Sequence, residues 1–195
     1  MAAPAKINFK VYQGSTFGEV LRWESSNKIY TPITNITKAA PVVITAAAIG
    51  APIGWRVKIT NVLGMTDINS EDVYHQISAV DSTTVTINSL NTVGYKAYTS
   101  GGIIEYNEPI DLASYTARMQ IRLKVADVDF IDELTTENGG ITIDNTLKTI
   151  TLNRTAGQTA VYTFNTAVYS LEMVGGTQVT PLASGTLTLV KEVTR

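Results

Sequence analysis

Few side chains in this sequence have the chemistry for catalysis. His75 is the only histidine and the chain has no cysteine, so His75 lacks a second nitrogen or sulfur ligand of the kind that zinc sites use. General acid–base catalysis also needs a second positioned group. No arrangement of Ser, His and Asp, and no pair of carboxylates, is identifiable from spacing. The sequence therefore predicts a protein that is not an enzyme and that uses no cofactor.

One acidic run is a candidate metal-binding segment. The run Asp127-Val-Asp-Phe-Ile-Asp-Glu133 brings together several carboxylates, and Ca²⁺ prefers several oxygen ligands. The run lacks the glycine and the regular spacing of an EF-hand loop, and acidic connections are commonly solvated. We therefore predict no metal site here. Tyr95, Tyr98 and Tyr106 are a candidate sugar-binding platform, although aromatic residues of small barrels more often lie in the core or at the rim.

A regular alternation of side chains marks the strand that organises the rest of the chain. Ala117, Met119, Ile121 and Leu123 alternate with Arg118, Gln120, Arg122 and Lys124. Successive side chains of a strand point to opposite faces, so the pattern predicts an apolar inner face and a basic outer face. At about 3.3 Å per residue, the outer row extends over roughly 20 Å. We expect either a solvated sheet face or a protein-contact face formed by Arg118, Arg122 and Lys124 that meets an acidic partner.

Composition restricts the class of protein. Hydrophobic residues make up 44% and charged residues 16% of the 195 residues, which is typical of a globular chain rather than a disordered one. Thr, Ile, Val and Ala dominate without a long helical period, which favours an all-β fold. The net charge of −2 argues against nucleic-acid binding. No apolar run approaches the roughly 18 residues of a membrane-spanning helix, and no secretory signal is visible, so we expect synthesis and folding in a cytoplasm.

The pattern of strands predicts two β domains, one inserted into the other. A phrase that begins at Thr31-Pro-Ile33 is nearly repeated at Pro109-Ile-Asp111, which indicates a domain opened in a loop. Residues 1–32 and 108–195 supply about seven strands with turn residues between them, which matches an immunoglobulin-like β-sandwich without its disulfide. Residues 33–107 contain short strands at regular spacing and predict a small β-barrel. Within the first segment, residues 24–30 are expected to form a polar connection.

Individual strands within these domains also follow from alternation. Trp55, Val57 and Ile59 are expected to point inward, as are Ile150 and Leu152. We further expect a continuous strand over residues 73–80.

The outer domain resembles the immunoglobulin-like domain of many tailed-phage structural proteins, including the N-terminal domain of upper-baseplate proteins. The phrases that carry the resemblance are Gln13-Gly-Ser-Thr-Phe17, Leu21-Arg-Trp23, Pro109-Ile-Asp-Leu112, Tyr115-Thr-Ala-Arg-Met-Gln-Ile-Arg122, Leu134-Thr-Thr-Glu-Asn-Gly-Gly-Ile141, Tyr169-Ser-Leu-Glu172 and residues 182–193.

The inserted segment resembles a domain that is named after the first catalytic cysteine half-domain of ubiquitin-activating enzymes and that recurs in phage virion proteins. Its phrases are Gly54-Trp-Arg-Val57, Gly64-Met-Thr-Asp-Ile-Asn69, Val80 and Gly94-Tyr-Lys-Ala-Tyr-Thr-Ser-Gly-Gly102. No ubiquitin chemistry carries over, because a chain without cysteine forms no thioester.

These resemblances imply a structural protein of a phage virion. The expected role is a tail or baseplate adaptor that links the tail to fibres or receptor-binding proteins. The alternatives are a capsid decoration or head–tail joining protein, and a carbohydrate-binding module that contacts the host surface. The expected partners are other virion proteins, such as tail, fibre or capsid subunits, with this chain present in multiple copies. We expect no nucleic-acid partner and no membrane insertion.

Overall fold

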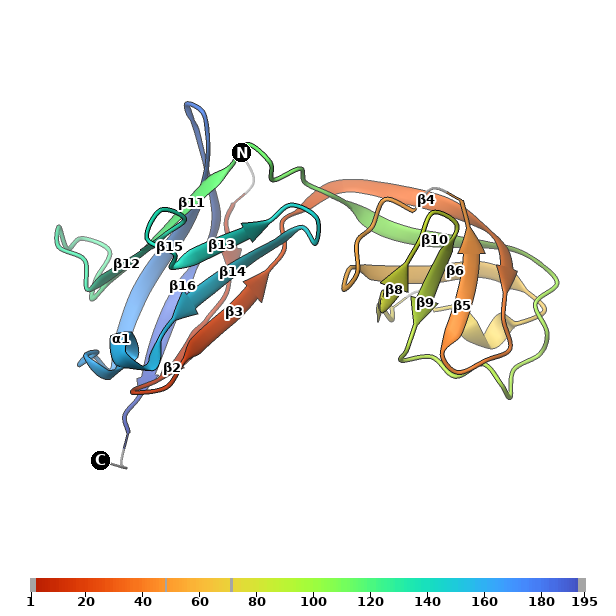
Figure 1. Cartoon of the computed structure of the whole chain (residues 1–195), viewed down its shortest axis with the longest axis horizontal. Helices are drawn as coiled ribbons and strands as arrows, with labels where there is room; N and C mark the ends of the chain where they lie inside the picture. Colours follow the sequence, from red (N-terminus) through yellow and green to blue (C-terminus); the bar gives the residue numbers. More distant parts are fainter. Residues whose placement is uncertain (1–2, 48, 71, 193–195) are drawn as a thin grey trace. The chain divides into compact units, whose positions relative to one another are not determined.

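The computed structural model describes residues 3–47, 49–70 and 72–192 (Figure 1). The chain is nearly all β, so the all-β, sandwich-like class expected from the sequence is confirmed. It divides into two compact units, of which the first combines Met1–Trp23 with Asp111–Arg195 and the second is Glu24–Ile110. Within the described residues the only α-helix is α1 (Ala156–Ala160).

The first unit contains a large sheet in which the middle strands are antiparallel. Its strands are β1 (Ala5–Lys6), β2 (Phe9–Tyr12), β11 (Thr116–Arg122), β12 (Asp132–Thr135), β15 (Thr166–Gly175) and β16 (Gln178–Val190). They follow the order β1-β16-β15-β11-β12, and β2 also pairs with β16. The strands β1 and β2 both run parallel to β16. They therefore cover the edge that β16 would otherwise leave open.

A smaller sheet packs against the inner face of the large one. It has the order β13 (Ile141–Asp144), β14 (Thr149–Arg154) and β3 (Phe17–Leu21). The rings of Phe9 on β2 and Phe17 on β3 meet edge to face at 5.8 Å between centroids, which joins the two sheets. Ile150 and Leu152 are buried as expected. Burial of these apolar side chains from both sheets is the main stabilising contribution to the unit.

The alternation of β11 is confirmed up to Arg122 and fails beyond it. Ala117, Met119 and Ile121 are at most 2% exposed, whereas Leu123 is 55% exposed. The strand ends because the backbone N–H of Asp127 donates to the carbonyl oxygen of Lys124, which closes a turn. The expectation of an inward Leu123 and of Lys124 in the outer row is therefore wrong. Side-chain alternation holds only while the backbone stays extended.

The second unit is a sheet of antiparallel strands. They are β4 (Glu24–Ile36), β5 (Val42–Ala46), β6 (Arg56–Leu63), β7 (His75–Gln76), β8 (Ala79–Val80), β9 (Thr84–Ile87) and β10 (Ser100–Pro109), with the 3₁₀ turn η1 (Thr66–Ile68) after β6. The order is β7-β6-β10-β4-β5-β9-β8. Its core residues include Trp55, Val57 and Ile59, each fully buried as expected.

The short strands β7 and β8 close this sheet into a barrel. They are consecutive pieces of one run, and β7 pairs with β6 while β8 pairs with β9. Between them, the backbone N–H of Ile77 donates to the carbonyl oxygen of Trp55, and the backbone N–H of Ser78 donates to the carbonyl oxygen of Thr86. The run expected as one strand over residues 73–80 therefore splits its hydrogen bonds between the two ends of the sheet. Closure leaves no long open edge.

Residues 24–30 form a strand rather than the expected polar connection. They are the first part of β4 and pair with β10, with Tyr30 opposite Glu105, Lys28 opposite Asn107 and Glu24 opposite Pro109. The second unit therefore begins at Glu24 rather than at residue 33. Most of these side chains are polar and exposed, so no apolar alternation marks the strand in the sequence.

Removing the second unit at its structural boundary is expected to leave the first unit folded. Glu24 and Pro109 are register partners, and such residues lie roughly 5 Å apart, so a short Gly-Ser linker can join Trp23 to Asp111. Circular dichroism should show a single cooperative thermal transition for this variant. A matched variant that removes only residues 33–107 keeps residues 24–32 of β4 without most of β10, and we expect it to be less soluble. Aggregation of the first variant would contradict the division into units.

Candidate functional site

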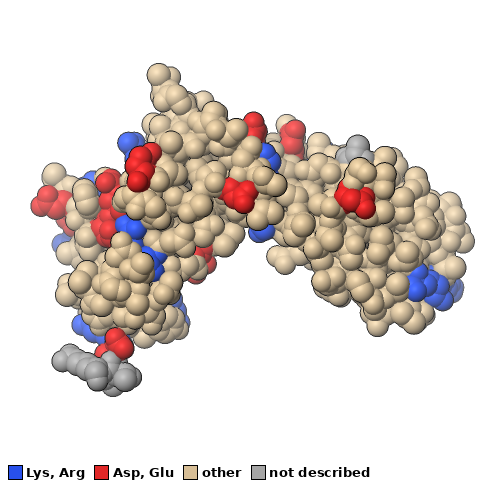
Figure 2. Space-filling view, in the orientation of Figure 1, with Lys and Arg blue, Asp and Glu red and all other residues tan. Residues whose placement is uncertain are grey.

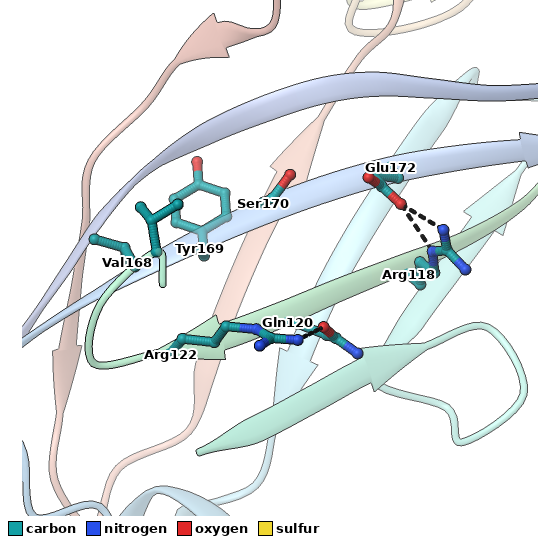
Figure 3. A pocket seen from close by; sticks show the side chains of 8 residues that line it. Arg118, Gln120, Arg122, Val168, Tyr169, Ser170 and Glu172 are labelled. Atoms are coloured by element: carbon teal, nitrogen blue, oxygen red, sulfur yellow. Dashed lines mark hydrogen bonds and ion pairs between the residues drawn. The ribbon is translucent and has the colours of Figure 1, made fainter. Parts of the chain in front are cut away.

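An open pocket lies on the outer face of the large sheet, over β11 and β15 (Figure 3). Arg118 stands opposite Glu172, Gln120 opposite Ser170, and Arg122 opposite Val168. The pocket has a volume of about 430 Å³. Its lining residues are Arg118, Gln120, Arg122, Val125, Val168, Tyr169, Ser170 and Glu172. We call this pocket the β11–β15 groove.

The groove has mixed charge, although the strand by itself predicts a basic surface. Arg118 Nη2 lies 2.8 Å from Glu172 Oε2 in an ion pair between neighbouring strands. On the other side, Gln120 Nε2 donates to Glu133 Oε1 of β12 at 2.7 Å. On the face shown in Figure 2, acidic and basic side chains of the first unit lie among one another. Tertiary pairing thus places one carboxylate beside Arg118 and another beside Gln120.

Arg122 differs from Arg118 because its hydrogen-bond acceptors are neutral. Its Nη2 donates to Gln120 Oε1 at 2.7 Å, and its Nη1 donates to the carbonyl oxygens of Val128, at 2.7 Å, and Asp127. Within the described residues no carboxylate lies within ion-pair distance of this guanidinium. The Arg122 side chain therefore fixes the backbone that follows β11. The positive charge of its guanidinium has no counterion among the described residues.

The segment held by Arg122 exposes apolar side chains. This segment, residues 123–131, is here called the apolar loop. A second bond fixes it, because the backbone N–H of Lys124 donates to Asp127 Oδ2 at 2.9 Å. The exposed fractions of its apolar residues are 55% for Leu123, 86% for Val125, 87% for Val128, 50% for Phe130 and 37% for Ile131. The apolar loop is thus fixed by hydrogen bonds at its base while its apolar side chains face solvent.

The acidic run does not converge on a metal site. Asp127 binds a backbone N–H, whereas the carboxylate of Asp132 accepts from Arg154 Nε at 2.7 Å. Over residues 3–47, 49–70 and 72–192, no three His, Cys, Asp or Glu side chains gather in a way that would hold a metal ion. Asp132 instead belongs to a structural cluster that joins β12 to β14.

The Asp132 cluster is a half-buried ion pair with a tyrosine. Arg154 is 5% exposed, and the Tyr162 hydroxyl also donates to Asp132 Oδ2. Burial of the Asp132 carboxyl acts to raise its pKa, but the hydrogen bonds from Arg154 and Tyr162 outweigh burial and hold the pKa below its usual value. Burial, followed by the bond to Asp132, raises the pKa of the Tyr162 hydroxyl.

The remaining candidate residues lie in the second unit and serve its packing. Tyr106 is 2% exposed and its hydroxyl accepts from the backbone N–H of Gly50 at 3.0 Å. The Tyr98 hydroxyl donates to the carbonyl oxygens of Ile33 and Gly101. Tyr95 packs against the core, so the three tyrosines do not form an exposed sugar-binding platform. His75 lies in β7, and burial lowers its pKa.

The sequence indicates Arg118 and Arg122 as outward residues but gives no signal for the apolar loop. Val125, Val128 and Phe130 lie among acidic residues, and their side chains follow no alternation that would mark them as exposed or buried. Their side chains are exposed because β11 ends at Arg122, before the loop begins.

Comparison of the sequence with protein-family models and with curated proteins identifies no relative. Among the described residues, no helix is long and apolar enough to cross a membrane.

Replacing Arg122 with Gln is expected to loosen the apolar loop while the sheet stays folded. The variant loses the bonds to the Asp127 and Val128 carbonyls, and hydrogen bonds of a charged donor contribute roughly 1.5–3 kcal/mol. Hydrogen exchange measured by mass spectrometry should become about tenfold faster over the apolar loop. Arg118→Gln is the matched control, since it leaves these carbonyl bonds intact. Equal exchange in both variants would show that Arg122 does not hold the loop.

Replacing Asp132 with Asn is expected to destabilise the protein in a pH-dependent way. Because the folded pKa of Asp132 is lowered, its stabilisation is present above the unfolded pKa of about 3.9 and is lost as pH falls through the folded value. Denaturant unfolding at pH 7 should show that the free energy of unfolding of the Asn variant is lower by about 3 kcal/mol. This value is at the low end for breaking a buried ion pair, because Asp132 is partly exposed. The difference from the unmodified chain should shrink below about pH 4. A constant difference at all pH values would contradict this role.

Proposed function

We propose that this chain is a non-enzymatic assembly protein of a tailed-phage virion, acting as an adaptor between the tail or baseplate and fibres or receptor-binding proteins. The assignment to a phage rests on the sequence resemblance of the two domains. The assembly role rests on the surface of the first unit. The observation that carries it is the apolar loop, whose Val125 and Val128 side chains are 86% and 87% exposed on a hydrogen-bonded base.

Exposed apolar side chains on an ordered loop favour protein contact. Single exposed apolar residues are ordinary, but several gathered on one short segment form the kind of patch that marks an interaction site. Because Arg122 and Asp127 already fix the backbone, little conformational entropy is lost when a partner covers the loop. The loop adjoins the β11–β15 groove through Val125, which lines that groove. Val125 therefore belongs to both the apolar loop and the β11–β15 groove.

The two compact units suit an adaptor. Each unit has its own buried core, so each presents a surface that does not depend on unfolding the other. An adaptor must bind at least two neighbours, and separately packed units provide separate surfaces for this. The first unit is assigned the assembly contact because it carries the groove and the apolar loop.

Placing Asn at Val125 and Val128 in the phage that encodes this chain is expected to reduce its incorporation into particles. Loss of two exposed apolar contacts removes binding energy without touching the buried core, so incorporation should fall at least about tenfold while expression stays unchanged. Quantitative mass spectrometry of purified particles measures the occupancy.

The matched control changes Val93 and Val161 to Asn. These valines are 57% and 74% exposed and lie outside the apolar loop.

Absence of the unmodified chain from intact particles, checked by immunogold electron microscopy, would overturn the virion proposal itself. Wild-type occupancy of the Val125 and Val128 variant would move the assembly contact away from the apolar loop.

A further inference from the structure

The two ends of the β11–β15 groove differ in charge. At one end, Arg118 and Glu172 pair with each other, so this end is neutral. At the other end, the guanidinium of Arg122 is bonded only to neutral oxygen atoms. Arg56 and Arg154 bind carboxylates, as Arg118 does. The groove therefore contains one cation whose charge is not balanced by a carboxylate of the described residues.

Two valines line the groove that contains this cation. Val168 is its register partner on β15, and Val125 lines the groove from the apolar loop. Figure 3 shows Arg122 and Val168 at the same end of the groove, away from the Arg118–Glu172 pair. A surface that covers Arg122 removes its water, and burying an unpaired charge is costly. The favoured occupant therefore supplies a carboxylate for Arg122 and an apolar group for the two valines.

The length of the groove fits a short extended peptide. Arg118 and Arg122 are four residues apart on β11, which corresponds to about 13 Å along the strand. The volume of about 430 Å³ is enough for a few side chains. An extended segment of roughly four residues spans that distance, since an extended chain rises about 3.3 Å per residue.

The neighbouring sheet edge does not offer the alternative of strand addition. The backbone N–H of Thr135 on β12 donates to Asn138 Oδ1, and that of Glu133 donates to Asp132 Oδ1. The Glu133 carbonyl accepts from Asn138 Nδ2 and Arg154 Nη2. These edge groups are already bonded within the chain, so a partner strand would have to displace them. Contact through side chains in the groove is therefore favoured.

We propose that the β11–β15 groove docks an extended acidic–apolar segment of a partner protein. A carboxylate of the segment binds Arg122, and a large apolar side chain within two residues of it packs between Val125 and Val168. This inference rests on the proposed assembly function and specifies the chemistry of the partner. The charge pair sets orientation and the apolar contact supplies most of the affinity.

Selection from a displayed library of random 12-residue peptides tests the proposal. The full chain serves as bait, and the Val125→Asn variant serves for counter-selection. The selected peptides should be enriched in Asp or Glu within two positions of a large apolar residue. Fluorescence anisotropy should show that Asp→Asn in the peptide, or Arg122→Gln in the protein, weakens binding at least about tenfold, corresponding to about 1.4 kcal/mol. Binding should also weaken as salt is raised.

Two controls separate the groove from the general surface. Val93→Asn alters an exposed valine of the second unit, 57% exposed, that lies outside the groove and should leave affinity within about twofold. Arg122→Lys keeps the charge but loses the fork of hydrogen bonds, and it should retain part of the binding.

Three results would each overturn the inference. The selected peptides could lack acidic enrichment, or they could bind the Arg122→Gln variant as well as the unmodified chain. The library could also yield no binder that is sensitive to Val125→Asn. These outcomes are distinct from failure of the proposed function, which is decided by whether the chain is present in particles.

Discussion

The antiparallel pairing of β11 with β15 is the contact on which both the core and the surface of the first unit depend. It joins Thr116–Arg122 to residues 168–174 through a continuous ladder. On the inner face, the ladder stacks Met119 beside Leu171, both fully buried. On the outer face, the same register places Arg122 beside Val168. Because successive side chains alternate, a shift of register by one residue would exchange the core with the groove. Packing of the apolar face therefore also fixes the geometry of the outer one.

Two arginines of this unit show how burial decides what a cation does. Arg154 is nearly buried and is held by Asp132 and Tyr162, because a buried charge without a partner is strongly destabilising. Arg122 is partly exposed, so water can solvate its charge while its N–H groups hold two backbone carbonyls. The first arginine stabilises the fold and the second fixes a surface loop. The difference arises from position, since both side chains have the same chemistry.

The sequence by itself determined the all-β class, the inward residues of β11 up to Ile121 and the buried set around Trp55. These features depend on local alternation of apolar side chains, which a strand expresses wherever it lies. It also identified Arg118 and Arg122 as outward cations on one strand.

Only the tertiary structure decided which residues lie beside Arg118 and Arg122. Glu172 and Glu133 come from strands that are distant in sequence or separated by a loop, and their pairing with β11 replaces a basic face with one of mixed charge. The strand at residues 24–30 and the closing run of β7 and β8 likewise depend on hydrogen bonds to partner strands rather than on apolar periodicity. Such non-local pairing leaves no local signal, and for the same reason the exposure of Val125 and Val128 was decided by where β11 ends.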